Sequence, residues 1–282
     1  MTFATPEAAD ARAESGGAPI ADKILNGAAG FWFLVAAIGQ WLFVLFIVGF
    51  YAFPTFSGNF EAWDKNTFMT HGYVAGDTAG NLAFAIHVML AAVITASGTV
   101  QLIPWIRARA ISFHRWSGRT FILAAFVISL AGLFMNATRG AGTFEHVPIA
   151  LNAVLLMFCA GQTIGHVWAG NIDVHRRWAL RTFMLMNGVW FLRVGMMAWM
   201  FGKIGLLGGP KEFDASFYAF WTYGSYLVPL AVLDLYFWTQ DRGGAGVKVA
   251  MAGLLVLLTT AMGAGIAGAA IAIWWRLLLK AW

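Results

Sequence analysis

The chain has 282 residues, of which 60% are hydrophobic and only 11% charged, and its mean hydropathy is +0.71. A soluble domain carries roughly twice that share of charge, so the composition excludes an ordinary soluble protein and indicates an integral membrane protein. The net charge of +5 does not indicate nucleic-acid binding, because basic residues of membrane proteins gather in the loops on one side of the bilayer.

Long apolar segments follow a polar N-terminal stretch, residues 1–28, which we expect to be a disordered cytoplasmic tail. A segment of about 20 apolar residues is long enough to cross the hydrocarbon core as a helix. We therefore predict an all-α polytopic bundle of about seven transmembrane helices in a single domain, residues 29–282. The predicted spans are residues 29–53, 81–106, 115–137, 148–168, 176–202, 217–239 and 249–275.

One basic and aromatic phrase occurs twice, as HRWSGRTF at residues 114–121 and as HRRWALRTF at residues 175–183. Each copy opens an apolar segment, and the two leading histidines lie 61 positions apart. The repeat predicts two helical hairpins in the same orientation within residues 81–202, related by a pseudo-two-fold axis along the membrane normal. His114 and His175 would then occupy equivalent positions.

The distribution of lysine and arginine predicts the orientation of the bundle. With the N-terminus inside, the cytoplasmic face carries 11 of the 18 basic residues and the opposite face carries 6. Because basic loops favour the cytoplasmic side, we predict a cytoplasmic N-terminus and place both copies of the phrase on that face.

His114 and His175 are candidate axial ligands of a haem b that would transfer electrons, because neutral imidazole binds haem iron. Arg115 and Arg176 could then neutralise the haem propionates. A purely structural role stays open, in which the arginines of the phrase, including Arg119 and Arg181, bind anionic lipids at the cytoplasmic face. A metal-dependent membrane protein is a further possibility, because imidazole also binds zinc and copper. Its metal ligands would be His114, His166 and His175.

Two further residues could support these sites. His87 lies within the second span, where an ionisable side chain is a functional candidate by default, and it could take part in a second haem site. Asp173 could cap the start of the fifth span or accept a hydrogen bond from His175 and so orient its ring.

Arg193 is the costliest single residue of the predicted spans, at about 3 kcal/mol or more if it lacks a partner. It should face the bundle interior, where Asp234 is the obvious acid and Asn136, Asn152 and Asn187 are possible hydrogen-bond partners. An alternative function is therefore a non-redox transporter or membrane scaffold with a polar path at Arg193 and Asp234. Small residues spaced four apart around Gly265 permit close helix contact, within the monomer or in a homodimer.

The chain resembles the DUF2306-type family of predicted bacterial multi-pass membrane proteins. The resemblance rests on His87 and on the two copies of the phrase, and it covers roughly residues 80–200. It implies a multi-pass helical protein with no established activity. We expect this protein to lie in the bacterial inner membrane. The two-hairpin plan is also similar to that of the ascorbate-reducible transmembrane cytochromes b, which implies bound haem and a redox partner.

Overall fold

The computed structural model describes residues 6–66, 72–139, 145–205 and 213–281, with side chains from residue 19 to residue 279 of these ranges. Within the described ranges the chain is helical and contains no strand. Several of its helices are long and apolar enough to span a membrane. The predicted all-α membrane bundle is therefore confirmed.

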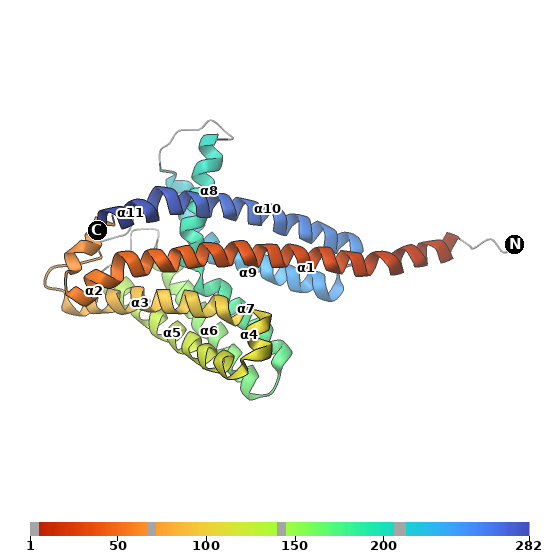
Figure 1. Cartoon of the computed structure of the whole chain (residues 1–282), viewed down its shortest axis with the longest axis horizontal. Coiled ribbons are helices and arrows are strands. Elements are labelled where there is room, and N and C mark those ends of the chain that lie inside the picture. Colours follow the sequence, from red (N-terminus) through yellow and green to blue (C-terminus); the bar gives the residue numbers. More distant parts are fainter. Residues whose placement is uncertain (1–5, 67–71, 140–144, 206–212, 282) are drawn as a thin grey trace.

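A long N-terminal helix, α1 (Pro6–Ile47), continues through a π-helical turn, η1 (Val48–Ala52), into the short α2 (Phe53–Ser57). A second continuous rod consists of α10 (Ala245–Ala269), the π-helical η3 (Ala270–Trp274) and α11 (Trp275–Ala281). The two rods lie side by side and run in the same direction (Figure 1). Near the starts of the rods, Leu25 and Met251 belong to one hydrophobic cluster. Near the ends of the rods, the ring of Phe43 packs against Trp274. Since α1 begins at Pro6, most of the predicted tail is helical.

The two predicted hairpins are present. The first pairs α3 (Thr78–Gln101) with α5 (Ile111–Thr138), and a short helix, α4 (Pro104–Arg109), separates them where Pro104 ends the predicted second span. The second pairs α6 (His146–Trp168) with α7 (Ile172–Met186). The hairpins pack on each other through α5 and α6.

The second hairpin departs from the first because its returning helix is broken. The predicted fifth span is two helices, α7 and α8 (Gly188–Gly205), which are bent by 57° at Asn187. Kinks of this size need a local cause such as a glycine or an interrupted hydrogen-bond ladder, and Gly188 follows the bend directly. In Figure 1, α8 stands steeply across α10, and the two helices are in contact.

The remaining predicted span is α9 (Ala215–Arg242), which packs on α7 and α8. Among the described residues, five helices are long and apolar enough to cross a membrane, or six if the bent pair α7–α8 counts as one span, and α9 is not one of them. The result is close to the predicted seven spans. A short 3₁₀ helix, η2 (Phe60–Lys65), connects α2 to the segment before α3.

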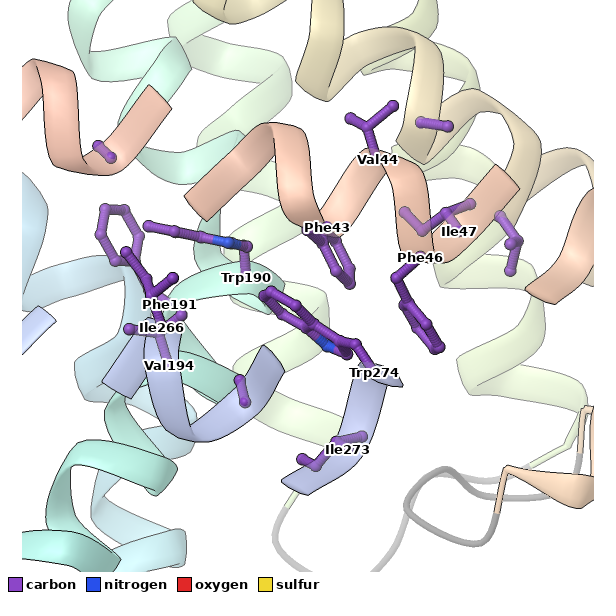
Figure 2. Close-up of a cluster of buried hydrophobic side chains, with 14 of the residues drawn as sticks. Phe43, Val44, Phe46, Ile47, Trp190, Phe191, Val194, Ile266, Ile273 and Trp274 are labelled. Carbon is purple, nitrogen blue, oxygen red and sulfur yellow. The ribbon is translucent and has the colours of Figure 1, made fainter. Parts of the chain in front are cut away.

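An aromatic core joins the two rods to the bent helix. Phe43 and Phe46 of the first rod pack on Trp274 of the second, and Trp190 of α8 donates a hydrogen bond to the carbonyl oxygen of Gly39 at 3.3 Å. Figure 2 shows these side chains converging from three elements that are distant in sequence. Such packing fixes the position of the bend relative to α1.

An ion pair holds the start of α3 to the end of α5. The backbone N–H of Gly80 donates to the Asp77 carboxylate at 2.8 Å, and Arg139 Nε lies 2.8 Å from its other oxygen. Arg139 also donates to Gly72 O at 3.2 Å and to Asn81 Oδ1 at 2.5 Å. The Gly80 N–H, and after it Arg139, hold the pKa of the Asp77 carboxyl below its usual range.

This lowered pKa predicts an acid-dependent loss of stability. The stabilisation by the Asp77 charge is complete above the unfolded-state pKa of about 4 and is lost as the pH falls through the folded-state pKa. On acidification from pH 7 to pH 3 we expect the melting temperature of the wild type to fall further than that of Asp77→Asn. Scanning fluorimetry in detergent measures this. Glu61→Gln, at an exposed carboxylate of η2, should retain the wild-type pH dependence, and an equally steep fall in Asp77→Asn would refute the assignment.

Candidate functional site

A cavity of about 160 Å³ lies inside the bundle. Its walls come from α1, η1, α3, α5, α6 and the bend between α7 and α8, so four helices and the bent pair α7–α8 converge on it. Most of the lining is apolar, and Figure 2 shows part of one wall, where Phe43, Phe46 and Ile47 of α1 lie near Trp190 of α8. Ligand sites have this character: an apolar concavity with a few placed polar groups.

Three of the polar atoms in this cavity are buried and have no hydrogen-bond partner among the described residues. They are His87 Nδ1 on α3, Ser129 Oγ on α5 and Asn152 Oδ1 on α6. The His87 ring lies near the backbone of Ile128, and its Nδ1 is buried without a partner in the described structure. Gly132 lies beside this nitrogen, because a Cβ atom at that position would be 3.9 Å from Nδ1.

Arg193, on the second turn of α8, lines the same cavity. Its guanidinium donates to Val189 O at 3.1 Å and lies 5.4 Å from the centre of the Phe43 ring. It also interacts electrostatically with His87 and with Tyr51 of η1. The structure thus brings together two residues that the sequence singled out separately, His87 and Arg193.

The expected pair of Arg193 with Asp234 is not formed. Asp234 instead binds Arg181, whose Nε and Nη2 lie 2.9 and 2.7 Å from Asp234 Oδ1. The reason is the bend, which directs α8 away from the part of α9 that carries Asp234, while the straight α7 keeps Arg181 beside it. The predicted polar path at Arg193 and Asp234 therefore does not run between these two residues.

The bend itself builds the site. Asn187 Nδ2 donates to Phe183 O at 2.8 Å within the last turn of α7, and Phe191 N donates to Asn187 O at 2.8 Å as α8 begins. A Cβ atom at Gly188 would lie 3.1 Å from Tyr226 Cβ and 3.2 Å from the Asn152 amide nitrogen. Only glycine leaves this space without displacing a neighbour, so the backbone of the bend approaches both side chains closely.

Ionisable side chains connect the cavity to the end of the bundle where α6 begins. Tyr218 of α9 interacts electrostatically with Arg193 and donates a hydrogen bond to the carboxylate of Glu145, the residue before α6. With His87 and Arg193 at the cavity, the Tyr218–Glu145 pair places further polar groups toward the start of α6.

Buried hydroxyl groups lie on the other side of the cavity. Thr95 lines it, and Thr99 is buried one turn further along α3. On the second hairpin, Thr163 Oγ1 and Thr182 Oγ1 are buried and 3.0 Å apart. These positions lie between the cavity and the repeated phrase, so polar side chains occupy the bundle interior along most of its length.

The repeated phrase occupies the opposite end of the bundle. His114 and His175 both lie in the first turn of their helices, α5 and α7, close enough to interact electrostatically. Nδ1 of His175 lies 2.9 Å from Thr163 O, so a neutral ring that donates there presents Nε2 as an acceptor. Nδ1 of His114 is buried and has no partner in the described structure, and its carbonyl accepts from Gln101 Nε2 at 2.9 Å.

The structure also places the other residues that were predicted around these histidines. Arg115 and Arg176 are exposed. Asp173 neither caps α7, whose N-cap is Asn171, nor orients His175, whose ring nitrogen lies against Thr163; it interacts electrostatically with Arg177 instead.

A three-histidine metal site is not assembled. Among the residues that the structure describes, which include all members of the predicted set, no three histidine, cysteine, aspartate or glutamate side chains are close enough to hold a metal ion. His166 is half-buried in the last turn of α6.

Residues 84–236, more than half of the chain, match the model of a family described as predicted membrane protein (DUF2306). The chain belongs to the DUF2306 family. The predicted family resemblance is thereby confirmed, whereas the similarity to the transmembrane cytochromes b is not shown. No curated protein and no solved structure matches the chain.

The DUF2306 region contains most of the polar lining of the cavity, including His87, Asn152 and Arg193, and α1 adds an apolar wall from outside it. Ser129 and Tyr51 were not predicted as site residues. A serine in an apolar helix is too common to single out, and no sequence signal marks the π-helical turn that contains Tyr51. Asn152 and Asn187 were predicted to assist Arg193, and both line the cavity with it.

Proposed function

We propose that this DUF2306 protein conducts a small polar solute through the membrane by way of the cavity beside His87. The proposal is supported mainly by one observation. Three buried polar atoms from three different helices, His87 Nδ1, Ser129 Oγ and Asn152 Oδ1, line one cavity without a hydrogen-bond partner among the described residues.

Such atoms are costly to leave unsatisfied. A buried donor or acceptor without a partner costs about 1–3 kcal/mol, and the hydrocarbon around a membrane bundle offers no water to compensate. An occupant that donates and accepts hydrogen bonds removes this cost at all three atoms together. The lining thus favours a polar occupant over an apolar one.

The volume limits the size of that occupant. A cavity of about 150 Å³ in another protein accommodates benzene, and the present one is about 160 Å³. Glycerol, urea and lactate fall within this limit, whereas a disaccharide does not. The polar groups on either side, from Glu145 at one end to His114 and His175 at the other, suit a path across the bundle. With the predicted cytoplasmic N-terminus, the Glu145 end faces outward.

The experiment is a flux measurement on purified protein in liposomes. Glycerol, urea and L-lactate serve as probes, with sucrose as the size control, and stopped-flow light scattering follows solute entry. We expect at least one small probe to enter at least about tenfold faster than in protein-free liposomes, while sucrose remains excluded. If all three probes enter no faster than in protein-free liposomes, the proposal is refuted. Ordered water would then be the occupant of the cavity.

A specific observation at the repeated phrase favours a second candidate function, electron transfer through a haem b held by His114 and His175. Metal-binding histidines almost always donate their second ring N–H to a carbonyl or carboxylate, and Thr163 O lies 2.9 Å from His175 Nδ1 in this way. We do not extend this candidate to His87, because cofactor pockets of about 300–1,000 Å³ exceed the cavity there.

An optical spectrum tests this candidate. Protein purified from haem-sufficient cells should show a Soret band that His175→Ala abolishes, while Thr163→Ser, which retains the backbone carbonyl, should keep it. Wild-type protein without a Soret band and without haem in a pyridine assay would exclude this function.

A further inference from the structure

The two copies of the phrase share a local structure that their sequences only partly show. In each copy a tryptophan is followed three residues later by an arginine that stacks on it. The guanidinium carbon of Arg119 lies 5.0 Å from the centre of the Trp116 ring, and that of Arg181 lies 4.8 Å from the Trp178 ring. Stacking holds the planar guanidinium while its N–H groups remain available to a partner.

In the second copy that partner is α9. Arg177 binds Asp241 through both terminal nitrogens, at 2.7 and 2.6 Å, and Arg181 binds Asp234. Both arginines also lie over the ring of Phe237, at 4.9 and 5.3 Å. Two carboxylates and an aromatic ring of the same chain therefore bind the arginines of the second copy.

The first copy has no such cover. Arg115 and Arg119, which correspond to Arg177 and Arg181, are exposed. In the described part of the chain neither lies within ion-pair distance of a carboxylate. The neighbouring α4 adds Arg107 and Arg109, and Arg109 stacks over Trp105 at 5.4 Å, so the basic surface continues beyond the phrase.

We propose that this surface, formed by α4 and the first three turns of α5, binds the phosphate groups of anionic phospholipids. Its apolar side chains point to lipid rather than to a soluble phosphate, because Trp105 and Trp116 remain 60% and 67% exposed beside the arginines. Exposed tryptophan next to arginine is typical of the membrane interface. Arginine forks bind phosphate as they bind carboxylate, so lipid takes the place that Asp234 and Asp241 occupy in the second copy.

The test compares lipid binding by the purified wild type and by Arg115→Gln/Arg119→Gln, using native mass spectrometry and thermal shift. Phosphatidylglycerol, phosphatidylcholine and soluble glycerol phosphate are added separately. We expect phosphatidylglycerol to bind the double variant on the order of tenfold more weakly than the wild type, since each basic residue near an anionic surface contributes measurably. Arg276→Gln, at an exposed arginine of α11, is the matched control and should bind like the wild type.

Two outcomes would overturn the assignment. Equal binding of phosphatidylglycerol to the wild type and the double variant would show that these arginines do not recognise the lipid. Equal stabilisation by glycerol phosphate and by the lipid would show a site for a soluble anion. An unchanged melting temperature of the lipid-free double variant confirms that weaker binding does not arise from unfolding.

Discussion

Replacing Gly265 with leucine should prevent the chain from folding into a stable monomer. A Cβ atom at this position would lie 2.2 Å from the backbone oxygen of Val194 and 2.9 Å from its Cγ1 atom. Because the obstacle is the backbone of α8 and not a flexible side chain, α10 would have to separate from α8. Overpacking in a core typically costs about 1–3 kcal/mol, occasionally more, and we expect an effect at the upper end of this range.

The same helix offers a matched control. Gly253 of α10 has open space around it, since a Cβ atom there would meet nothing within 4 Å. Gly253→Leu should therefore melt within a few degrees of the wild type, while Gly265→Leu should yield little monodisperse protein in size-exclusion chromatography. Equal melting temperatures for the two variants would contradict the close packing of α8 on α10.

Filling the cavity beside His87 should abolish solute flux without unfolding the protein. A Cβ atom at Gly132 would make ordinary contact with the His87 ring, at 3.6 Å from Cε1. Gly132→Ala should therefore conduct like the wild type, whereas the longer side chain of Gly132→Leu would occupy the space that the solute needs. We expect the rate in the leucine variant to fall to that of protein-free liposomes, a loss of about tenfold or more.

A second variant separates solute binding from simple packing. Asn152→Leu replaces a half-buried amide, whose buried oxygen lacks a partner in the described structure, by an apolar group of similar size. Removing such a group is often neutral or stabilising, so we expect the melting temperature to be unchanged or raised while the flux falls. Lower stability with unchanged flux would mean that Asn152 serves the fold alone.

Much of the fold could be predicted from the sequence, because apolar segment length is a strong signal in membrane proteins. The repeated phrase correctly predicted that α3 pairs with α5 and that α6 pairs with α7. The bend at Asn187 was not predicted, because residues 176–202 together have the length of one span, whereas the close approach of the Gly188 backbone to Asn152 and Tyr226 arises only in the fold. The cytoplasmic orientation of the N-terminus stays a prediction.

The candidate site was predicted in parts and not as a whole. His87 and Arg193 were recognised because an ionisable residue in an apolar segment is costly. Their meeting at one cavity depends on the bend, so the sequence instead suggested Asp234 as the partner of Arg193. The sequence around Asp234 does not indicate that this residue pairs with Arg181. The ion pair forms because α7 runs straight beside α9.

The most direct test of solute passage through the cavity is the flux of glycerol, urea and L-lactate in liposomes that contain Gly132→Ala or Gly132→Leu. Both variants should be present in equal amounts and should have similar melting temperatures. The structure predicts rapid entry of at least one probe with alanine at position 132 and protein-free rates with leucine. Equal entry rates in the two variants would contradict passage through this cavity.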